Sequence, residues 1–296
     1  MTTTDLSPTG TGVTFARLGP VGDEIPVVQR LGISYDLRGL TADLDGSFLS
    51  RGGIMAARRA LDAKALPQLI GAADLRVGSP IARPIKIVCI GLNYRDHTVE
   101  TNAEFPPEPV VFMKDPSTLI GPMDTMLIPQ KSVKTDWEVE LGVVIGAEGR
   151  YLDSPEAADA IIAGYALSHD VSEREFQIER GGQWDKGKSS ETFNPLGPVL
   201  VPADEITDPQ RLGMRLWVNG ELKQNGSTSN MIFGIRHIVW YLSQFMVLRP
   251  GDLINTGTPA GVALGAPEPK PYLRAGDIVE LEIDGLGHAR QELEQA

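Results

Sequence analysis

The sequence predicts an α+β fold that is mainly β, with a small N-terminal domain before a larger domain built on mixed β-sheets. Short apolar runs rich in β-branched residues, each bounded by Gly, Pro, Asn or Asp, recur along most of the chain, which is the pattern of strands joined by turns. Few segments show a helical period, and strands and helices do not alternate as they do in a parallel βαβ sheet. With 296 residues, 42% of them hydrophobic, the chain is long enough to bury a large core.

The first part of the chain predicts a small β-rich domain over residues 1–80. Strands are expected at residues 13–17, 25–29 and 32–36, which Gly-Pro and Gly-Asp turns separate, and a helix is expected over the Ala- and Arg-rich residues 54–64. Residues 77–84 contain two prolines and are expected to connect this domain to the main domain, residues 81–296.

The main domain is predicted to be rich in strands. Two helices are expected, one over residues 155–163 with Ser154 as its N-cap and one that begins at Asn230 or Ile232 and ends at Phe245. Residues 171–177 also have a helical pattern. The expected strands are residues 86–90, 110–113, 138–145, 163–169, 215–218, 252–256 and 278–283.

Charge and cysteine content exclude several classes of function. The formal net charge of −12 makes nucleic acid and anionic membranes poor partners. No apolar run is long enough to cross a bilayer, and residues 1–10 lack the basic start and apolar core of a signal peptide, so we expect a soluble, cytoplasmic protein. The single cysteine, Cys89, allows no intrachain disulfide and no Cys-based zinc site.

Residues 137–145 (WEVELGVVI) carry two acidic residues inside an apolar strand. Strand side chains alternate between faces, so Glu138 and Glu140 point the same way and repel each other. A bound divalent cation would relieve that repulsion, because hard cations prefer carboxylate oxygens. The alternative is a strand with one face in water, on which both carboxylates are simply solvated.

Asp170 follows directly on the strand predicted at residues 163–169. Residues at strand ends often project into functional sites, so Asp170 could complete a carboxylate trio with Glu138 and Glu140. Three carboxylates leave positions open for water and substrate, as Mg²⁺ or Mn²⁺ requires in catalysis. In the alternative, Asp170 only caps the helical segment that follows.

His97 and Glu100 are three residues apart in residues 91–100 (GLNYRDHTVE), after a buried strand. If this segment is helical, the two side chains touch, and the carboxylate orients the ring and raises its basicity. That pair would suit a base that activates water. The alternative is a surface helix with an incidental histidine.

Two further segments carry polar groups with weaker signals. Residues 181–198 are rich in glycine and contain Lys186 and Lys188, which could supply positive charge to an acidic pocket or lie in a solvated loop. Residues 255–261 (NTGTPAG) end a strand with hydroxyls and free backbone N–H groups that could bind a carboxylate.

Taken together, these segments resemble the fumarylacetoacetate hydrolase family over about residues 84–293. The matching segments occur in the family's order: residues 91–100, 137–145, 170–177, 188–195 and 256–261. The resemblance implies the mixed β-sheet roll of that family, usually as a homodimer. It departs from the best-known members at residues 90–92 (IGL), where they carry a fourth acidic ligand, and this argues for a site with three carboxylates.

The resemblance also implies a chemistry and a role for each residue. Mg²⁺ or Mn²⁺ would be held by Glu138, Glu140 and Asp170, and the substrate would be a small 2,4-diketo acid that is cleaved at a C–C bond to pyruvate and a carboxylic acid. The resemblance further implies that His97, with Glu100, is the base that activates water, and that Lys188 stabilises charge. The residues expected to contact the substrate are Arg174, Gln177, Thr258 and Lys114.

Three functions stay open at this point. Among hydrolases, members acting on 2,4-diketo-3-deoxy sugar acids are the most similar in the loop at residues 184–188 and in the N-terminal domain, and an acylpyruvate hydrolase is the alternative. A decarboxylase of the oxaloacetate type or a keto–enol isomerase would use the same site without attack by water. A relative that binds ligand but has lost catalysis is the third possibility, although it would have no need of His97, Glu100 and Lys188.

Overall fold

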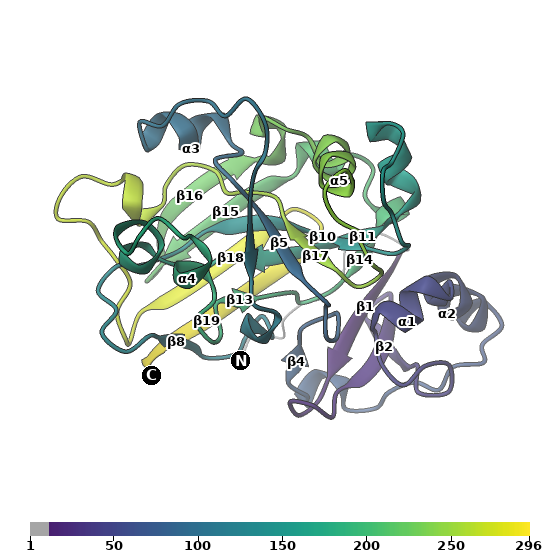
Figure 1. Cartoon of the computed structure of the whole chain (residues 1–296). Coiled ribbons are helices and arrows are strands. Elements are labelled where there is room, and N and C mark those ends of the chain that lie inside the picture. Colours follow the sequence, from purple (N-terminus) through teal and green to yellow (C-terminus); the bar gives the residue numbers. More distant parts are fainter. Residues whose placement is uncertain (1–11) are drawn as a thin grey trace.

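The computed structural model describes residues 12–296 and has the mainly β architecture expected from the sequence (Figure 1). The chain begins with a four-stranded antiparallel sheet in the order β3-β2-β1-β4, accompanied by two helices. Its elements are β1 (Val13–Leu18), β2 (Ile25–Arg30), β3 (Ile33–Asp36), α1 (Gly46–Ser50), α2 (Gly53–Asp62) and β4 (Val77–Gly78). The predicted strands and the helix α2 are present, whereas α1 was not predicted and the expected connector contributes β4. Residues 1–10, whose composition argued against a signal peptide, lie outside the described residues.

The site is built on a six-stranded mixed sheet in the order β14-β11-β10-β17-β5-β6. Only the pair β17–β5 is parallel; the other neighbours are antiparallel. Its strands are β5 (Ile87–Gly91), β6 (Val110–Lys114), β10 (Val139–Ile145), β11 (Ile162–His169), β14 (Val201–Pro202) and β17 (Leu253–Asn255). All seven residues of β10 are buried, because this strand lies in the interior of the sheet and is covered on both faces.

A five-stranded sheet in the order β16-β15-β18-β19-β8 packs against β10 and β11. The core between the two sheets contains Leu141 and Val143 from β10 and Leu216 and Leu281 from the facing sheet. Its strands are β8 (Met126–Ile128), β15 (Gly213–Val218), β16 (Glu221–Ser227), β18 (Ile278–Ile283) and β19 (Gly287–Gln295). The sequence did not predict β16 and β19, because both strands are largely polar.

The helices of the main part are short and differ from the predictions at their ends. The segment expected at residues 155–163 is a 3-10 helix, Pro155–Ala160, and the side chain of Ser154 does not cap it. The later helix α5 is Ile235–Ser243; it begins after Ile232 because its N-cap, Gly234, has an extended backbone with φ −69° and ψ 164°. Residues 171–177 form a short strand and the start of a π-helix rather than one helix.

The remaining elements are short connections between the sheets. They are α3 (Arg95–Glu100), α4 (Asp185–Lys188), β7 (Leu119–Ile120), β9 (Thr135–Asp136), β12 (Ser172–Glu173), β13 (Asn194–Pro195), the π-helix Glu175–Glu179, and 3-10 turns at Ala72–Asp74, Pro116–Thr118, Ala203–Glu205, Pro209–Arg211, Thr228–Asn230 and Ala263–Gly265. None of the helices among residues 12–296 is long and apolar enough to cross a membrane.

The N-terminal sheet and the six-stranded sheet share one hydrophobic cluster. Phe15 and Leu200 exchange two backbone hydrogen bonds of 2.9 and 2.8 Å. Phe15 and Val28 also pack in the same cluster as Ile87 and Leu253. The division into residues 1–80 and 81–296 stays a prediction, because these contacts bind the two parts to each other.

Candidate active site

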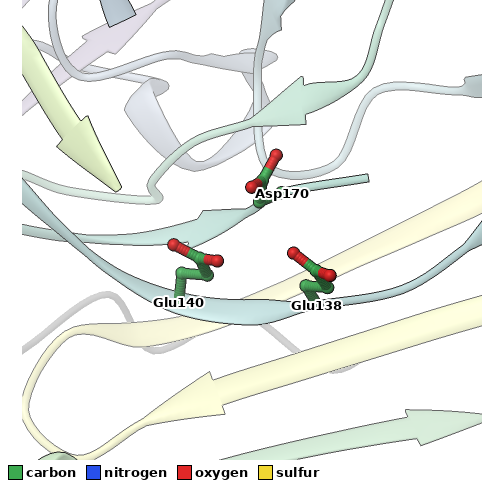
Figure 2. Close-up of side chains that lie close together, drawn as sticks. All are labelled: Glu138, Glu140 and Asp170. Atoms are coloured by element: carbon green, nitrogen blue, oxygen red, sulfur yellow. The ribbon is translucent and has the colours of Figure 1, made fainter. Parts of the chain in front are cut away.

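Three carboxylates converge where β10 begins and β11 ends (Figure 2). Glu138 directly precedes β10, Glu140 lies within it, and the N–H of Asp170 donates to the carbonyl of Glu138 over 3.0 Å. One oxygen from each carboxylate lies within 4.8 Å of the others. Glu138 is 5% exposed, Glu140 2% and Asp170 0%, so the reading of two solvated carboxylates on a water-facing strand is excluded.

Two of the three carboxylates are ion-paired with buried cations. Lys188 Nζ lies 2.8 Å from Glu138 Oε2 and 2.8 Å from Asp170 Oδ2. Lys114 Nζ lies 2.5 Å from Asp170 Oδ1, and Arg174 Nη2 lies 2.6 Å from Glu138 Oε1. Among residues 12–296, Glu140 accepts only the backbone N–H of Gly257, over 2.8 Å. The positive charge is therefore unevenly shared, and Glu140 has least of it.

The pKa values follow that uneven charge. Burial raises the pKa of Glu140 well above its usual range, and the charges of Asp170 and Glu138 raise it further. Burial would also raise the pKa of Glu138, but Lys188 and Arg174 together hold it below its usual range. Burial disfavours the ammonium of Lys188, yet Asp170 and Glu138 raise its pKa. The site thus lacks positive charge beside Glu140.

The donor set suits a hard divalent cation. Three buried carboxylates with oxygens in reach of one another offer the ligands that Mg²⁺ or Mn²⁺ prefers. The raised pKa of Glu140 marks where a cation would relieve repulsion among them. Glu138, Glu140 and Asp170 therefore fit the metal that the resemblance implies.

A cavity of about 170 Å³ opens onto these groups. It is lined by seven of the residues singled out from the sequence, namely His97, Glu138, Glu140, Arg174, Gln177, Lys188 and Thr258. Asp170, Glu100 and Lys114 do not line it: Asp170 and Lys114 lie behind Lys188 and Glu138 in the buried ion-pair network.

His97 and Glu100 lie side by side on α3, as the three-residue spacing predicts. His97 Nδ1 is 3.5 Å from Glu100 Oε2, but within residues 12–296 this nitrogen has no hydrogen-bond partner. Both oxygens of Glu100 instead accept the N–H of Gly261, over 3.0 and 2.9 Å. Glu100 therefore anchors the loop after β17 and sits next to the ring without bonding to it.

The four residues expected to contact substrate have structural partners. Arg174 Nε bonds to Asp136 Oδ2 over 2.8 Å and Nη1 to Gln177 Oε1 over 3.0 Å. These two bonds fix the guanidinium group, and Arg174 thereby orients Glu138. Thr258 Oγ1 donates to the carbonyl of Val139 over 2.9 Å. Lys114 differs from the expectation, because its ammonium is wholly buried against Asp170 and Val171 and does not reach the cavity.

Sequence reasoning missed Asp136 and Trp184, and it included Gly257 only within the turn at residues 255–261. Asp136 is buried and accepts the N–H groups of Ala263 and Leu264 as well as Arg174; its spacing of two from Glu138 was a usable signal. Gly257 has φ +98°, a backbone angle that favours glycine, and it presents its N–H to Glu140. Trp184 lines the cavity, and nothing local in the sequence indicated this.

A family model described as fumarylacetoacetate hydrolase, C-terminal, matches residues 86–294. A relative from Burkholderia cenocepacia, named only provisionally as a hydrolase, is 48% identical over 281 residues, which are 95% of this chain and 98% of that one.

Solved structures of enzymes share the fold over 96% of this chain. A fumarylacetoacetate hydrolase from Exiguobacterium antarcticum is 34% identical with a TM-score of 0.85 and is covered over 100% of its length. A 2-hydroxyhepta-2,4-diene-1,7-dioate isomerase from Mycobacterium marinum is 29% identical with a TM-score of 0.70 and is covered over 99%. A maleylpyruvate hydrolase from Sphingobium sp. SYK-6, solved with manganese(II) and pyruvate, is 27% identical with a TM-score of 0.77 and is covered over 99%.

The family match extends over most of the chain, and the fold of these enzymes matches the two packed sheets described above. Both the resemblance noted in the sequence and the fold it implied are therefore confirmed. The chain belongs to the fumarylacetoacetate hydrolase family and is an enzyme of its hydrolase or isomerase kind.

Proposed function

We propose that this enzyme is a divalent-cation-dependent hydrolase that cleaves a C–C bond in a 2,4-diketo acid and releases pyruvate and a carboxylic acid. One observation carries the proposal: a single cavity is lined by Glu138, Glu140, Lys188 and His97, with Asp170 directly behind them. The manganese(II) and pyruvate in the maleylpyruvate hydrolase structure support it.

Glu138, Glu140 and Asp170 would hold Mg²⁺ or Mn²⁺. When bound, such a cation supplies Lewis-acid stabilisation to the carboxylate and keto oxygens of a substrate. Arg174 keeps Glu138 in place through its 2.6 Å hydrogen bond, and Lys114 does the same for Asp170. The protein therefore orients the cation's ligands before substrate enters.

His97 is the group placed to take a proton from water, because its ring lies in the cavity wall and its Nδ1 is 3.5 Å from the Glu100 carboxylate, whose charge would stabilise the protonated ring. The oxygen of that water bonds to the carbonyl carbon farther from the carboxylate. The bond from this carbon to the carbon between the two carbonyls breaks, and the electron pair stays on the latter carbon, which takes up a proton. One water is consumed, and the products are a carboxylic acid and pyruvate.

Lys188 would stabilise the negative charge that grows on the pyruvate half as that bond breaks. Its ammonium lies in the cavity wall. Burial lowers the pKa of Lys188, but the charges of Asp170 and Glu138 outweigh that effect and raise it, so the side chain stays charged. A preorganised cation in a buried site stabilises developing charge more than water does.

An isomerase is the second candidate, because the Mycobacterium marinum isomerase shares the fold. It would use the same charged groups to move a proton without attack by water. A decarboxylase would likewise need no water and would release CO₂. Identification of the products separates the three reactions, since only hydrolysis yields a carboxylic acid and pyruvate in equal amounts.

The test is a panel of 2,4-diketo acids assayed with Mg²⁺ and with Mn²⁺ while pyruvate, carboxylic acid and CO₂ are followed. His97→Ala should retain Mn²⁺ binding and lose hydrolysis by about 100-fold or more, whereas Glu138→Ala should lose both. Near wild-type hydrolysis by His97→Ala would refute the assignment of the base. Failure of the Mn²⁺-loaded enzyme to hydrolyse any member of the panel would refute the proposed function.

A further inference from the structure

The indole of Trp184 lies directly against Gly91 at the end of β5. A Cβ added to Gly91 would stand 2.5 Å from Trp184 Cζ3, so only glycine lets the ring lie this close. The ring also meets Phe112 edge-on, with centroids 5.3 Å apart. Trp184, Gly91 and Phe112 all line the cavity, and the tryptophan is thus seated as part of its wall.

The rest of the wall outside the charged cluster is largely apolar. Ile90, Leu92, Ile178 and Leu264 line it together with the two aromatic rings. Among the polar lining residues, the Thr101 hydroxyl donates to the carbonyl of His97 over 2.9 Å.

Most other polar lining groups are also occupied; the exception is Gln177, whose Oε1 accepts from Arg174 while its amide nitrogen has no hydrogen-bond partner within residues 12–296. The Thr258 hydroxyl is bonded to Val139 and Gln224, and Arg174 is bonded to three side chains. A hydroxyl or carboxylate on this part of a ligand would meet few free partners.

The cavity is also small. Its volume of about 170 Å³ lies below the roughly 300–1,000 Å³ of pockets that hold drug-sized ligands. The carboxylates and Lys188 occupy part of its wall and would face the pyruvate half of a diketo acid. Little space is left for the acyl half, and the surface around that space is apolar.

We infer that Trp184, held against Gly91, determines which acyl group the enzyme accepts and that it selects short apolar ones. The inference rests on the proposed function. It places hydroxylated substrates such as 2,4-diketo-3-deoxy sugar acids, and those with a second carboxylate, among the poor substrates. The physical reason is that a polar group transferred from water to this wall loses its hydration and gains few hydrogen bonds in return.

The first test compares kcat/KM for matched diketo acids with Mg²⁺ present. Wild type should prefer 2,4-dioxohexanoate over its 5,6-dihydroxy counterpart by about 10- to 100-fold, the range that an apolar pocket achieves against an added hydroxyl. Equal rates, or preference for the dihydroxy acid, would overturn the inference and leave the proposed function standing. Absence of pyruvate release from both acids would overturn the proposed function itself.

The second test moves the tryptophan in two independent ways. Trp184→Gln should reduce the preference to about threefold or less, whereas Trp184→Leu should keep it and accept longer acyl chains. Gly91→Ala should shift the preference in the direction of Trp184→Gln, because the new methyl group displaces the ring. Trp240→Phe is the matched control, since Trp240 does not line the cavity.

A third test measures competitive inhibition by product-like acids. Inhibition constants report binding, so they do not depend on how fast each variant turns over a substrate. Inhibition constants of 2-oxopentanoate and 5-hydroxy-2-oxopentanoate should differ by about 10-fold in wild type and should converge in Trp184→Gln. An unchanged ratio of constants in both Trp184→Gln and Gly91→Ala would show that another part of the wall selects the acyl group.

Discussion

Charge around single residues decides what this site can bind. Glu138 is paired with Lys188 and Arg174, and Asp170 with Lys188 and Lys114, while Glu140 accepts a single backbone N–H from the part of the chain that the structure describes. The repulsion between Glu138 and Glu140 is therefore partly relieved already, since Lys188 and Arg174 pair with Glu138. A divalent cation would complete the balance at Glu140, where burial and the neighbouring carboxylates raise the pKa.

Lys114 offers a test of that balance. Lys114→Met leaves Asp170 with one cation fewer, and loss of a partner from a buried ion pair costs about 3–5 kcal/mol of unfolding free energy. Because a bound divalent cation returns positive charge to the cluster, saturating Mn²⁺ should stabilise this variant more than it stabilises wild type. Thermal unfolding with and without Mn²⁺ measures the difference.

Lys86→Met is the matched control, because Lys86 pairs with buried Asp252 and neither residue lines the cavity. Its loss of stability should be the same with and without Mn²⁺. If Mn²⁺ stabilises Lys114→Met no more than wild type, Lys114 does not share charge with the cation site.

His169 gives the protein a predictable response to acid. Burial lowers the pKa of His169 from 6.5 to about 4, against the opposing hydrogen bond of Gln291; Lys114 adds to the lowering, and Asp170 and Glu138 oppose it. As the pH falls, the imidazole of His169 is protonated in the unfolded chain before it is protonated in the folded protein. His169 therefore contributes stability above pH 6.5, and that stability is lost as the pH falls from about 6.5 to 4. The full loss is about 3 kcal/mol.

Urea unfolding of wild type and His169→Gln at several pH values tests this contribution. The stability of the variant should fall less steeply between pH 6.5 and 4, whatever its stability at pH 7. Parallel curves for the two proteins would mean that the buried imidazole is not the group responsible.

At the scale of elements, the antiparallel pair β10–β11 and the loop after β17 together assemble the site. Register places Glu140 opposite Ser168, with Asp170 two residues beyond, on the same face. The loop is held through its backbone N–H groups: Gly257 donates to Glu140, Gly261 to Glu100 and Ala263 to Asp136. Each of these carboxylates also lies in or beside the site, so the loop and the site are ordered together.

The segment at residues 99–109 begins in the last turn of α3 and is predicted to act as a lid. Thr101 and Ala103 line the cavity, while Val99 is 68% and Phe105 55% exposed. Closure over a ligand would exclude water and bury those two side chains. Limited proteolysis at Phe105 should slow several-fold when Mg²⁺ and a diketo-acid analogue are added.

Cleavage elsewhere provides the control for the lid. Cutting at Phe245, which is 67% exposed on the segment after α5, should keep its rate when the analogue is added. If the rate at Phe105 is equally unchanged, residues 99–109 form an ordinary surface loop.

At the scale of the whole molecule, we expect the N-terminal part and the sheet that carries the site to unfold as one unit. Phe15 is completely buried in the hydrophobic cluster that also contains Ile87 and Leu253, and it bonds to Leu200 through the backbone. Phe15→Ala should cost about 3–5 kcal/mol and shift a single unfolding transition, measured by calorimetry. A separate early transition that leaves the site intact would show that residues 1–80 form an independent domain. Phe245→Ala, at an exposed position, is the control.

Much of the fold and part of the site follow from local pattern. The period of two placed Glu138 and Glu140 on one face, and the three-residue spacing placed His97 beside Glu100. Strands such as β10 and β18 were predictable because apolar residues recur along them. The polar strands β16 and β19 were not, since they are strands only by pairing with β15 and β18. The homodimer, the cytoplasmic location and the choice between Mg²⁺ and Mn²⁺ stay predictions.

The sequence by itself determined the family, the positions of the main strands along the chain, and the three carboxylates with their nearby histidine and lysine. Tertiary structure alone decided that Lys114 faces Asp170 rather than the cavity, that Glu100 bonds to Gly261, and that Trp184 closes the wall against Gly91. The physical reason is range: periodicity and spacing act between neighbours in the chain, whereas the partner of a buried charge or an aromatic ring is set by segments that only packing brings together.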